Sequence, residues 1–174
     1  MEIAKFMIDM LIDNYCILDL ETTGLSCIKN EIIEVGILKV RNNEIVARYS
    51  KLVKPKAKVS KNITKITGIT NEMLEDKPVI EEIIIEILTF IGDDVIIGHN
   101  VLFDLGFISS VIEMDLPNMY IDTVMFSKIT YPELRRHRLS DLTNYLGIYT
   151  NTHRAIDDCI ATKELYDDIK KRNM

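Results

Sequence analysis

Two acidic residues two positions apart, Asp19 and Glu21, end an otherwise apolar run that begins at Tyr15. Strand side chains alternate between faces, so a strand here would point both carboxylates the same way. Paired negative charges at the end of a buried strand repel each other and lose hydration, a cost that bound cations would offset. The segment 22–24 then predicts a turn at which the backbone can approach a ligand. Taken alone, this stretch is also compatible with an ordinary strand and polar turn.

Two further acids, Asp104 and Asp158, each head an apolar stripe on a predicted helix. The helix expected over about 102–113 places apolar residues three, four and seven positions after Asp104 on its face. An Asp in a first turn can be a simple cap or dipole partner, but its place on the buried stripe argues against that role alone. In the last helix Asp158 shares its face with small and apolar residues, whereas the face of Asp157 also carries acids. We therefore expect Asp158 to lie inward and Asp157 to lean toward solvent.

His153 precedes Asp158 by five residues. In a continuous helix the two would lie roughly 140° apart, so both reach one site only if His153 lies in the preceding loop. A lone loop histidine is usually a cap or surface residue, but beside converging acids a proton-accepting role is favoured, with an unperturbed pKa of about 6.5. Carboxylates are hard oxygen ligands, and two divalent ions about 3.5–4 Å apart suit phosphodiester cleavage. We therefore predict a site for two ions, Mg²⁺ or Mn²⁺, held by Asp19, Glu21, Asp104 and Asp158.

The elements that must position these residues alternate between strands and helices. Two β-rich runs, 31–40 and 45–53, are separated by the turn-rich segment 41–44 and predict a hairpin. With the strand that carries Asp19, they predict a three-stranded antiparallel start to a sheet. After the hairpin we expect a short helix ended by Gly68, another capped by Thr70, and a longer helix with Pro78 in its first turn and an apolar face from Ile80 to Ile91. A strand over 95–97 then precedes the helix over 102–113, and a strand over 120–123 leads into a short helix with Asp122 and Thr123 as local caps. The last two expected elements are a helix capped by Ser140 and ended by Gly147, and a helix that runs to about Lys171.

Length and composition point to one soluble globular domain over residues 1–174. The chain is 47% hydrophobic and 28% charged, which is typical of a globular protein. Three cysteines cannot all pair, and Cys16 and Cys159 lie in apolar patterns, so reduced core thiols in a cytoplasmic protein are favoured. The segment 1–13 is interrupted by charges and predicts an amphipathic helix, with no signal peptide or membrane span. That helix would pack on its own domain or on a partner.

A net charge of −6 argues at first against nucleic acid as a partner. The four site carboxylates account for much of it, and bound ions would cancel their charge. A lysine-rich segment over 51–65 and an arginine-rich segment over 135–138 then remain to hold a single strand. Both segments are equally compatible with solvated loops.

Three segments, 19–25, 99–104 and 153–158, resemble in order and separation the three motifs of the DEDDh 3′→5′ exonucleases. The similarity extends over nearly the whole chain, from about Tyr15 to Lys171. The resemblance implies a ribonuclease H-like α/β fold, a mixed five-stranded sheet whose first three strands are antiparallel, flanked by helices. By motif position it implies metal ligands at Asp19, Glu21, Asp104 and Asp158, a general base at His153, and a pocket for the terminal nucleotide formed by Thr22, Thr23, Leu25, Asn100 and Phe103.

Within that family the run from Glu21 to Gly24 is most similar to the proofreading subunit of bacterial DNA polymerase III. This similarity implies hydrolysis of single-stranded DNA from its 3′ end to 5′-mononucleotides, with a DNA polymerase as a possible partner. Three alternatives stay open: a 3′→5′ exoribonuclease acting on short RNA, because motifs do not separate the two sugars; a non-catalytic polymerase-associated module; and another nuclease of the same fold, which the position of His153 disfavours.

Overall fold

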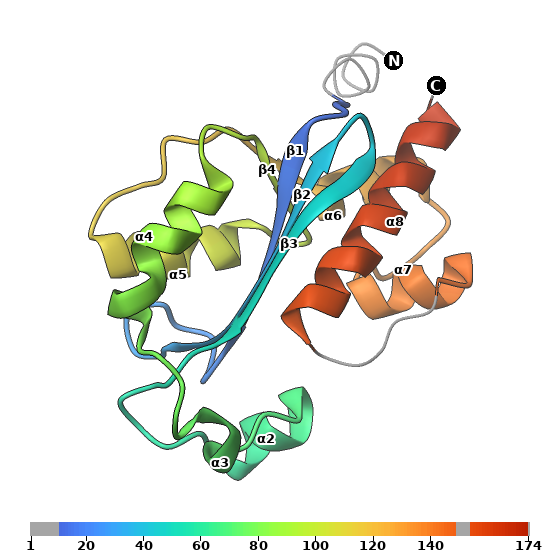
Figure 1. The fold of residues 1–174 in the computed structure, drawn as a ribbon. Coiled ribbons are helices and arrows are strands. Elements are labelled where there is room, and N and C mark those ends of the chain that lie inside the picture. The colour runs from blue at the N-terminus through green and yellow to red at the C-terminus, as the bar shows by residue number, and fades with distance from the viewer. Residues whose placement is uncertain (1–10, 149–153, 174) are drawn as a thin grey trace.

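A computed structural model describes residues 11–148 and 154–173 of the chain. Its centre is a five-stranded sheet in the order β3-β2-β1-β4-β5 (Figure 1). The first three strands pair antiparallel, whereas β4 pairs parallel with β1, and β5 pairs parallel with β4. The predicted mixed sheet with an antiparallel start is therefore confirmed.

The elements follow the predicted alternation closely. They are β1 (Tyr15–Thr22), β2 (Ile32–Arg41), β3 (Glu44–Leu52), α2 (Lys61–Thr67), α3 (Asn71–Leu74), α4 (Ile80–Ile91), β4 (Ile96–Gly98), α5 (Leu102–Ile112), β5 (Tyr120–Asp122), α6 (Thr123–Thr130), α7 (Leu139–Leu146) and α8 (Ala155–Asn173).

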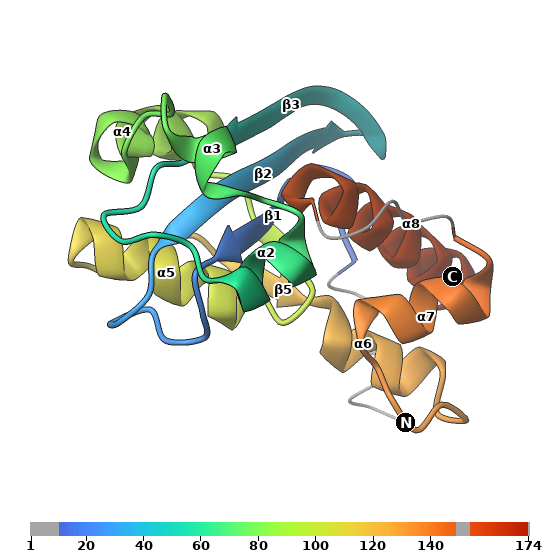
Figure 2. The ribbon, with the colours of Figure 1, turned by 90° about the horizontal axis from the view of Figure 1, so that it is seen from below.

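Helices cover both faces of the sheet, α4 and α5 on one side and α6, α7 and α8 on the other (Figure 2). Alternate residues of β1 point to the two sides. Leu18 and Leu20 join the core beneath α4 and α5, whereas Tyr15 and Ile17 join the core beneath α8. By the same alternation, Asp19 and Glu21 point toward α8. The alternation of side chains along β1 thus puts Asp19 and Glu21 on the side of the sheet that α8 covers, so a residue of α8 can share a site with them.

Helix ends match the predictions at most positions. Gly68 and Gly147 end α2 and α7 in the left-handed region, at φ 72° and 69°. Thr70 caps α3 by accepting a hydrogen bond from the Met73 N–H, and Asp122 caps α6 by accepting one from the Val124 N–H.

Three predictions about helix starts are wrong. Ser140 lies inside the first turn of α7, whose N-cap is Arg138. Pro78 lies just before α4, whose N-cap is Val79. Thr123 does not cap α6, because its buried hydroxyl donates to the Gly98 carbonyl oxygen and fastens α6 to β4 instead. In each case the residue type suits a helix start, but the N-cap lies one or two positions away from it in the chain.

The helix predicted over 1–13 lies mostly outside the described residues. Leu11, Ile12 and Asp13 are described and are not helical. The Ile12 N–H donates to the Tyr166 hydroxyl at 3.0 Å, which ties this segment to α8. Within the described parts of the chain, no helix is long and apolar enough to cross a membrane. Cys16 and Cys159 are buried free thiols, as predicted.

Candidate active site

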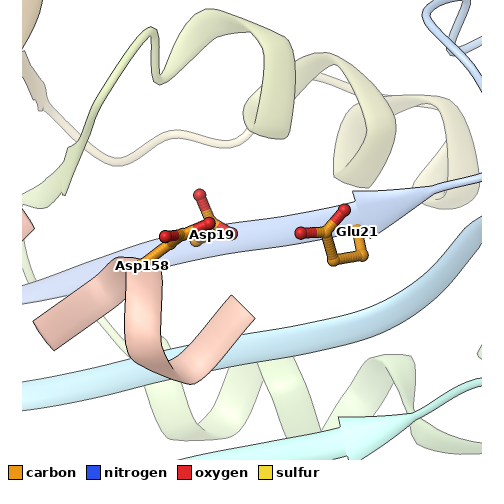
Figure 3. Close-up of side chains that lie close together, drawn as sticks. All are labelled: Asp19, Glu21 and Asp158. Carbon is orange, nitrogen blue, oxygen red and sulfur yellow. The ribbon is translucent and has the colours of Figure 1, made fainter. Parts of the chain in front are cut away.

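Three carboxylates meet where β1 passes the start of α8. One oxygen from each of Asp19, Glu21 and Asp158 lies within 4.8 Å of the other two. Asp19 and Glu21 come from one face of β1, and Asp158 comes from the first turn of α8 (Figure 3). The inward placement of Asp158 agrees with its face, because Ala161, Thr162, Leu165 and Ile169 are all buried. Asp157 is not a member of this carboxylate group.

Proximity and burial raise the pKa values of Asp19 and Glu21. Burial, followed by the charges of Asp158 and Glu34, raises the pKa of Glu21 to about 8, against a partial lowering by Arg154. Burial and the charges of Asp104 and Asp158 raise the pKa of Asp19 well above its ordinary value. Clustered carboxylate oxygens are the donors that Mg²⁺ and Mn²⁺ prefer, and the positive charge of such an ion would relieve the repulsion. The residues present therefore fit the predicted metals.

Asp104 lies beside this group without belonging to it. Its side chain is 4% exposed, and its Oδ1 accepts a hydrogen bond from the Leu20 N–H at 3.0 Å. Leu20 is the residue between Asp19 and Glu21, so this bond fastens the start of α5 to the acidic end of β1. Burial raises the pKa of Asp104, against the Leu20 N–H, which lowers it. The predicted burial of Asp104 is confirmed, and its role as a metal ligand stays a prediction.

His153 lies outside the described residues, and its role as general base stays a prediction. Its neighbour Arg154 is described and is not helical, and α8 begins at Ala155.

Two of the predicted nucleotide-pocket residues, Thr22 and Thr23, shape the turn after β1. The Thr22 hydroxyl donates to the Gly24 carbonyl oxygen at 2.7 Å, and the Thr23 hydroxyl accepts from the Glu31 N–H at 3.0 Å. Leu25, at the tip of this turn, is 88% exposed. Such an apolar side chain on an ordered turn is available for stacking against a base.

The other two pocket residues lie where β4 leads into α5. Asn100 adopts φ 69°, and its N–H donates to the Asp122 carboxylate at 3.0 Å. Phe103 packs against Phe107 with ring centroids 5.0 Å apart, so one side of its ring faces the core. Binding of a nucleotide by these five residues stays a prediction.

Sequence reasoning missed two residues beside the site, Glu34 and Arg154. Glu34 pairs with Glu21 in the β1–β2 register and is 0% exposed, and its carboxylate binds Arg154. A signal was available, because Glu34 interrupts an apolar run from Ile32 to Leu38 that can only be buried.

A mixed five-stranded sheet with clustered carboxylates at the end of its first strand is the arrangement expected of a ribonuclease H-like nuclease. The chain belongs to the RNase T exonuclease family, whose model matches residues 16–166. The family is one of nuclease hydrolases, and the predicted family is therefore confirmed.

Curated relatives are the PolC-type DNA polymerases III. The chain is 39% identical over 157 residues to that of Clostridium perfringens and 40% identical over 157 residues to that of Thermotoga maritima. These alignments cover 88% and 87% of this chain but only 11% of each relative. The chain thus spans about a tenth of the length of these polymerases.

Solved structures share the fold. Exonuclease X in complex with 5′ overhanging duplex DNA superimposes with a TM-score of 0.73 at 29% identity, covering 90% of this chain and 91% of that one. Escherichia coli exonuclease I in complex with a dT13 oligonucleotide superimposes with a TM-score of 0.79 at 21% identity, covering 92% of this chain and 42% of that one.

Proposed function

We propose that this chain is a metal-dependent 3′→5′ exonuclease that hydrolyses single-stranded DNA from its 3′ end and releases 5′-mononucleotides, in proofreading or repair. The observation that carries the proposal is the group formed by Asp19, Glu21 and Asp158 at the end of β1. The PolC-type relatives and the DNA complex of exonuclease X support DNA as the substrate.

In this proposal the acids hold two divalent ions, Mg²⁺ or Mn²⁺, with Asp104 completing the ligand set. Such ions, when bound, would lower the pKa of the attacking water and would neutralise charge on the reacting phosphate. His153, which precedes Asp158 by five residues in the sequence, accepts the proton of the attacking water. Asp19 and Glu21 keep their positions because both pair with β2, and because the Leu20 N–H between them donates to Asp104.

The terminal nucleotide is held, in the same proposal, by the turn after β1 and the start of α5. Leu25 stacks on a base from its exposed position, and the backbone of Thr22 and Thr23 lies along the sugar. Asn100 and Phe103 form the opposite wall.

The surrounding charge favours a grip on a few terminal nucleotides rather than on a long duplex. Within the lysine-rich segment, Lys51 and Lys56 pair with Glu86 and Glu81. Lys58, Lys61 and Lys65 are exposed. We assign these three lysines, with the exposed arginines of 135–138, to contacts with phosphate.

The similarity to PolC-type enzymes supports a DNA polymerase as partner and a place of action in the cytoplasm, with residues 1–174 acting as one exonuclease domain.

The test is digestion of matched single-stranded DNA and RNA oligomers with Mg²⁺ or Mn²⁺, beside the Asp19→Ala variant. We expect loss of nucleotides from 3′ ends, faster on DNA, no cutting of circular single strands, and at least a hundredfold loss of rate in the variant. A faster rate on RNA would select the exoribonuclease alternative. Intact 3′ ends on both strands with either ion would select the non-catalytic module.

A further inference from the structure

A fully buried charge lies directly beside the metal-binding acids. Glu34 is 0% exposed near the start of β2 and faces Glu21 across the β1–β2 pair. Burying a carboxylate is costly unless it is paired, and an apolar residue of similar size would seat a helix at least as well. The position therefore calls for an explanation other than packing.

The partner of Glu34 is the residue that leads into α8. The Arg154 guanidinium donates to Glu34 through Nε at 2.9 Å and through a terminal nitrogen at 2.6 Å. The Ala155 N–H, at the first residue of α8, donates to the other Glu34 oxygen at 3.1 Å. One carboxylate thus holds both the last residue before the helix and the first helical N–H, a geometry that fixes direction as well as position.

Gly36, two residues after Glu34 in β2, brings α8 into contact with the sheet. Gly36 pairs with Asp19, and a Cβ at this glycine would lie 2.4 Å from the carbonyl carbon of Ala155. One turn later the Cys159 thiol donates to the Gly36 carbonyl oxygen at 3.2 Å. The β2 partners of Asp19 and Glu21 are therefore two of the residues that support the start of α8.

We propose that Glu34 and Arg154 are positioning residues of the metal site: their ion pair fixes the start of α8 on β2, and so holds Asp158 against Asp19 and Glu21. The inference rests on the proposed function only in requiring that these acids bind divalent ions. Residues that orient the ligands of a metal site typically change its affinity ten- to a hundredfold when altered.

The same helix offers a matched control at its other end. Lys170 is 5% exposed and binds Asp13, the Asn43 amide oxygen and, at 2.9 Å, the Ile12 carbonyl oxygen. Asp158 lies twelve residues away, about 18 Å along the helix axis. Lys170→Met therefore removes a buried charge and its hydrogen bonds from the end of α8 that is distant from the carboxylate group.

The experiment measures Mn²⁺ affinity by calorimetry and the metal-free melting temperature for Glu34→Gln, Arg154→Met, their double variant and Lys170→Met. We expect each of the first two to weaken Mn²⁺ binding at least tenfold. In Glu34→Gln the guanidinium would turn to Glu21, and in Arg154→Met the helix start would lose its anchor. The double variant should lose no more affinity than either single variant, because both act through one contact. Lys170→Met should lower the melting temperature but leave affinity within twofold.

Activity adds an independent readout. For Arg154→Met we expect the DNA KM to stay within threefold of wild type and the rate to recover as Mn²⁺ is raised. Stronger Mn²⁺ binding by Arg154→Met would overturn the inference, because removing a nearby cation would then act through charge alone. Unchanged affinity in both single variants, an equal loss in Lys170→Met, or a wild type that binds no Mn²⁺ would overturn it too. A wild type that binds Mn²⁺ but degrades no strand would refute the proposed function, while the affinities would still decide this inference.

Discussion

Without metal, ionised Glu21 should destabilise the folded protein, and replacing it with Gln should relieve that penalty. Burial and neighbouring acids raise the pKa of Glu21 from 4.5 to about 8. Above pH 4.5 the folded state therefore binds more protons than the unfolded state, so its stability falls as pH rises toward 8 and then levels off. Each tenfold change in proton affinity is worth about 1.36 kcal/mol, so Glu21 should cost about 2.5 kcal/mol more at pH 9 than at pH 6.

The assay is urea unfolding with a chelator present, at pH 6 and at pH 9, for wild type and Glu21→Gln. At pH 6 Glu21 is protonated in the folded state but ionised in the unfolded chain, whereas Gln is neutral in both, so the variant should already have a free energy of unfolding about 2 kcal/mol higher. At pH 9 the folded wild type has lost this proton too, so the advantage of the variant should grow by about 2.5 kcal/mol, to about 4.5 kcal/mol. Glu164→Gln, on the exposed face of α8, should show no such difference. Equal destabilisation of Glu21→Gln at both pH values would refute the reasoning, because Glu21 would then contribute packing or hydrogen bonds rather than repulsion.

Three further results are expected. Gly36→Ala should lower the free energy of unfolding by about 1–3 kcal/mol, measured in urea, because the added methyl would overlap the backbone of Ala155; unchanged stability would contradict the close contact. His153→Ala should lower kcat by about 10²–10⁴-fold and remove the acid limb of the pH–rate profile while leaving Mn²⁺ affinity unchanged; weaker Mn²⁺ binding would instead mark it as a ligand. Mn²⁺ at a hundred times its Kd should stabilise the wild type by about 2.7 kcal/mol, measured by thermal unfolding, and Asp19→Asn far less; equal stabilisation would place the ions elsewhere.

Much of the fold was readable from local patterns. Alternation and turn residues predicted the hairpin of β2 and β3, and helical periodicity predicted α4, α5 and α8 within a few residues. The face argument placed Asp158 rather than Asp157 in the carboxylate group. These predictions succeed because each depends on which side of one element is buried.

Contacts between residues that are far apart in the sequence could not be predicted from such local patterns. Glu34 and Arg154 are 120 residues apart, and they meet only because of the register of β2 in the sheet and the position at which α8 packs on it. The Thr123 hydroxyl likewise found its partner on β4 instead of in its own helix. Local propensity describes what a residue can do within one turn, whereas these contacts depend on how the elements pack.

The most direct test of the account follows a 5′-labelled single-stranded DNA oligomer with Mn²⁺ for wild type, Asp158→Asn and Asp157→Asn. Asp158 belongs to the carboxylate group and its neighbour does not, so the pair separates metal binding from a general loss of charge at the helix start. The account predicts a ladder that shortens from the 3′ end with wild type and Asp157→Asn and nearly disappears with Asp158→Asn. An unchanged ladder with Asp158→Asn, or no ladder with wild type, would contradict it.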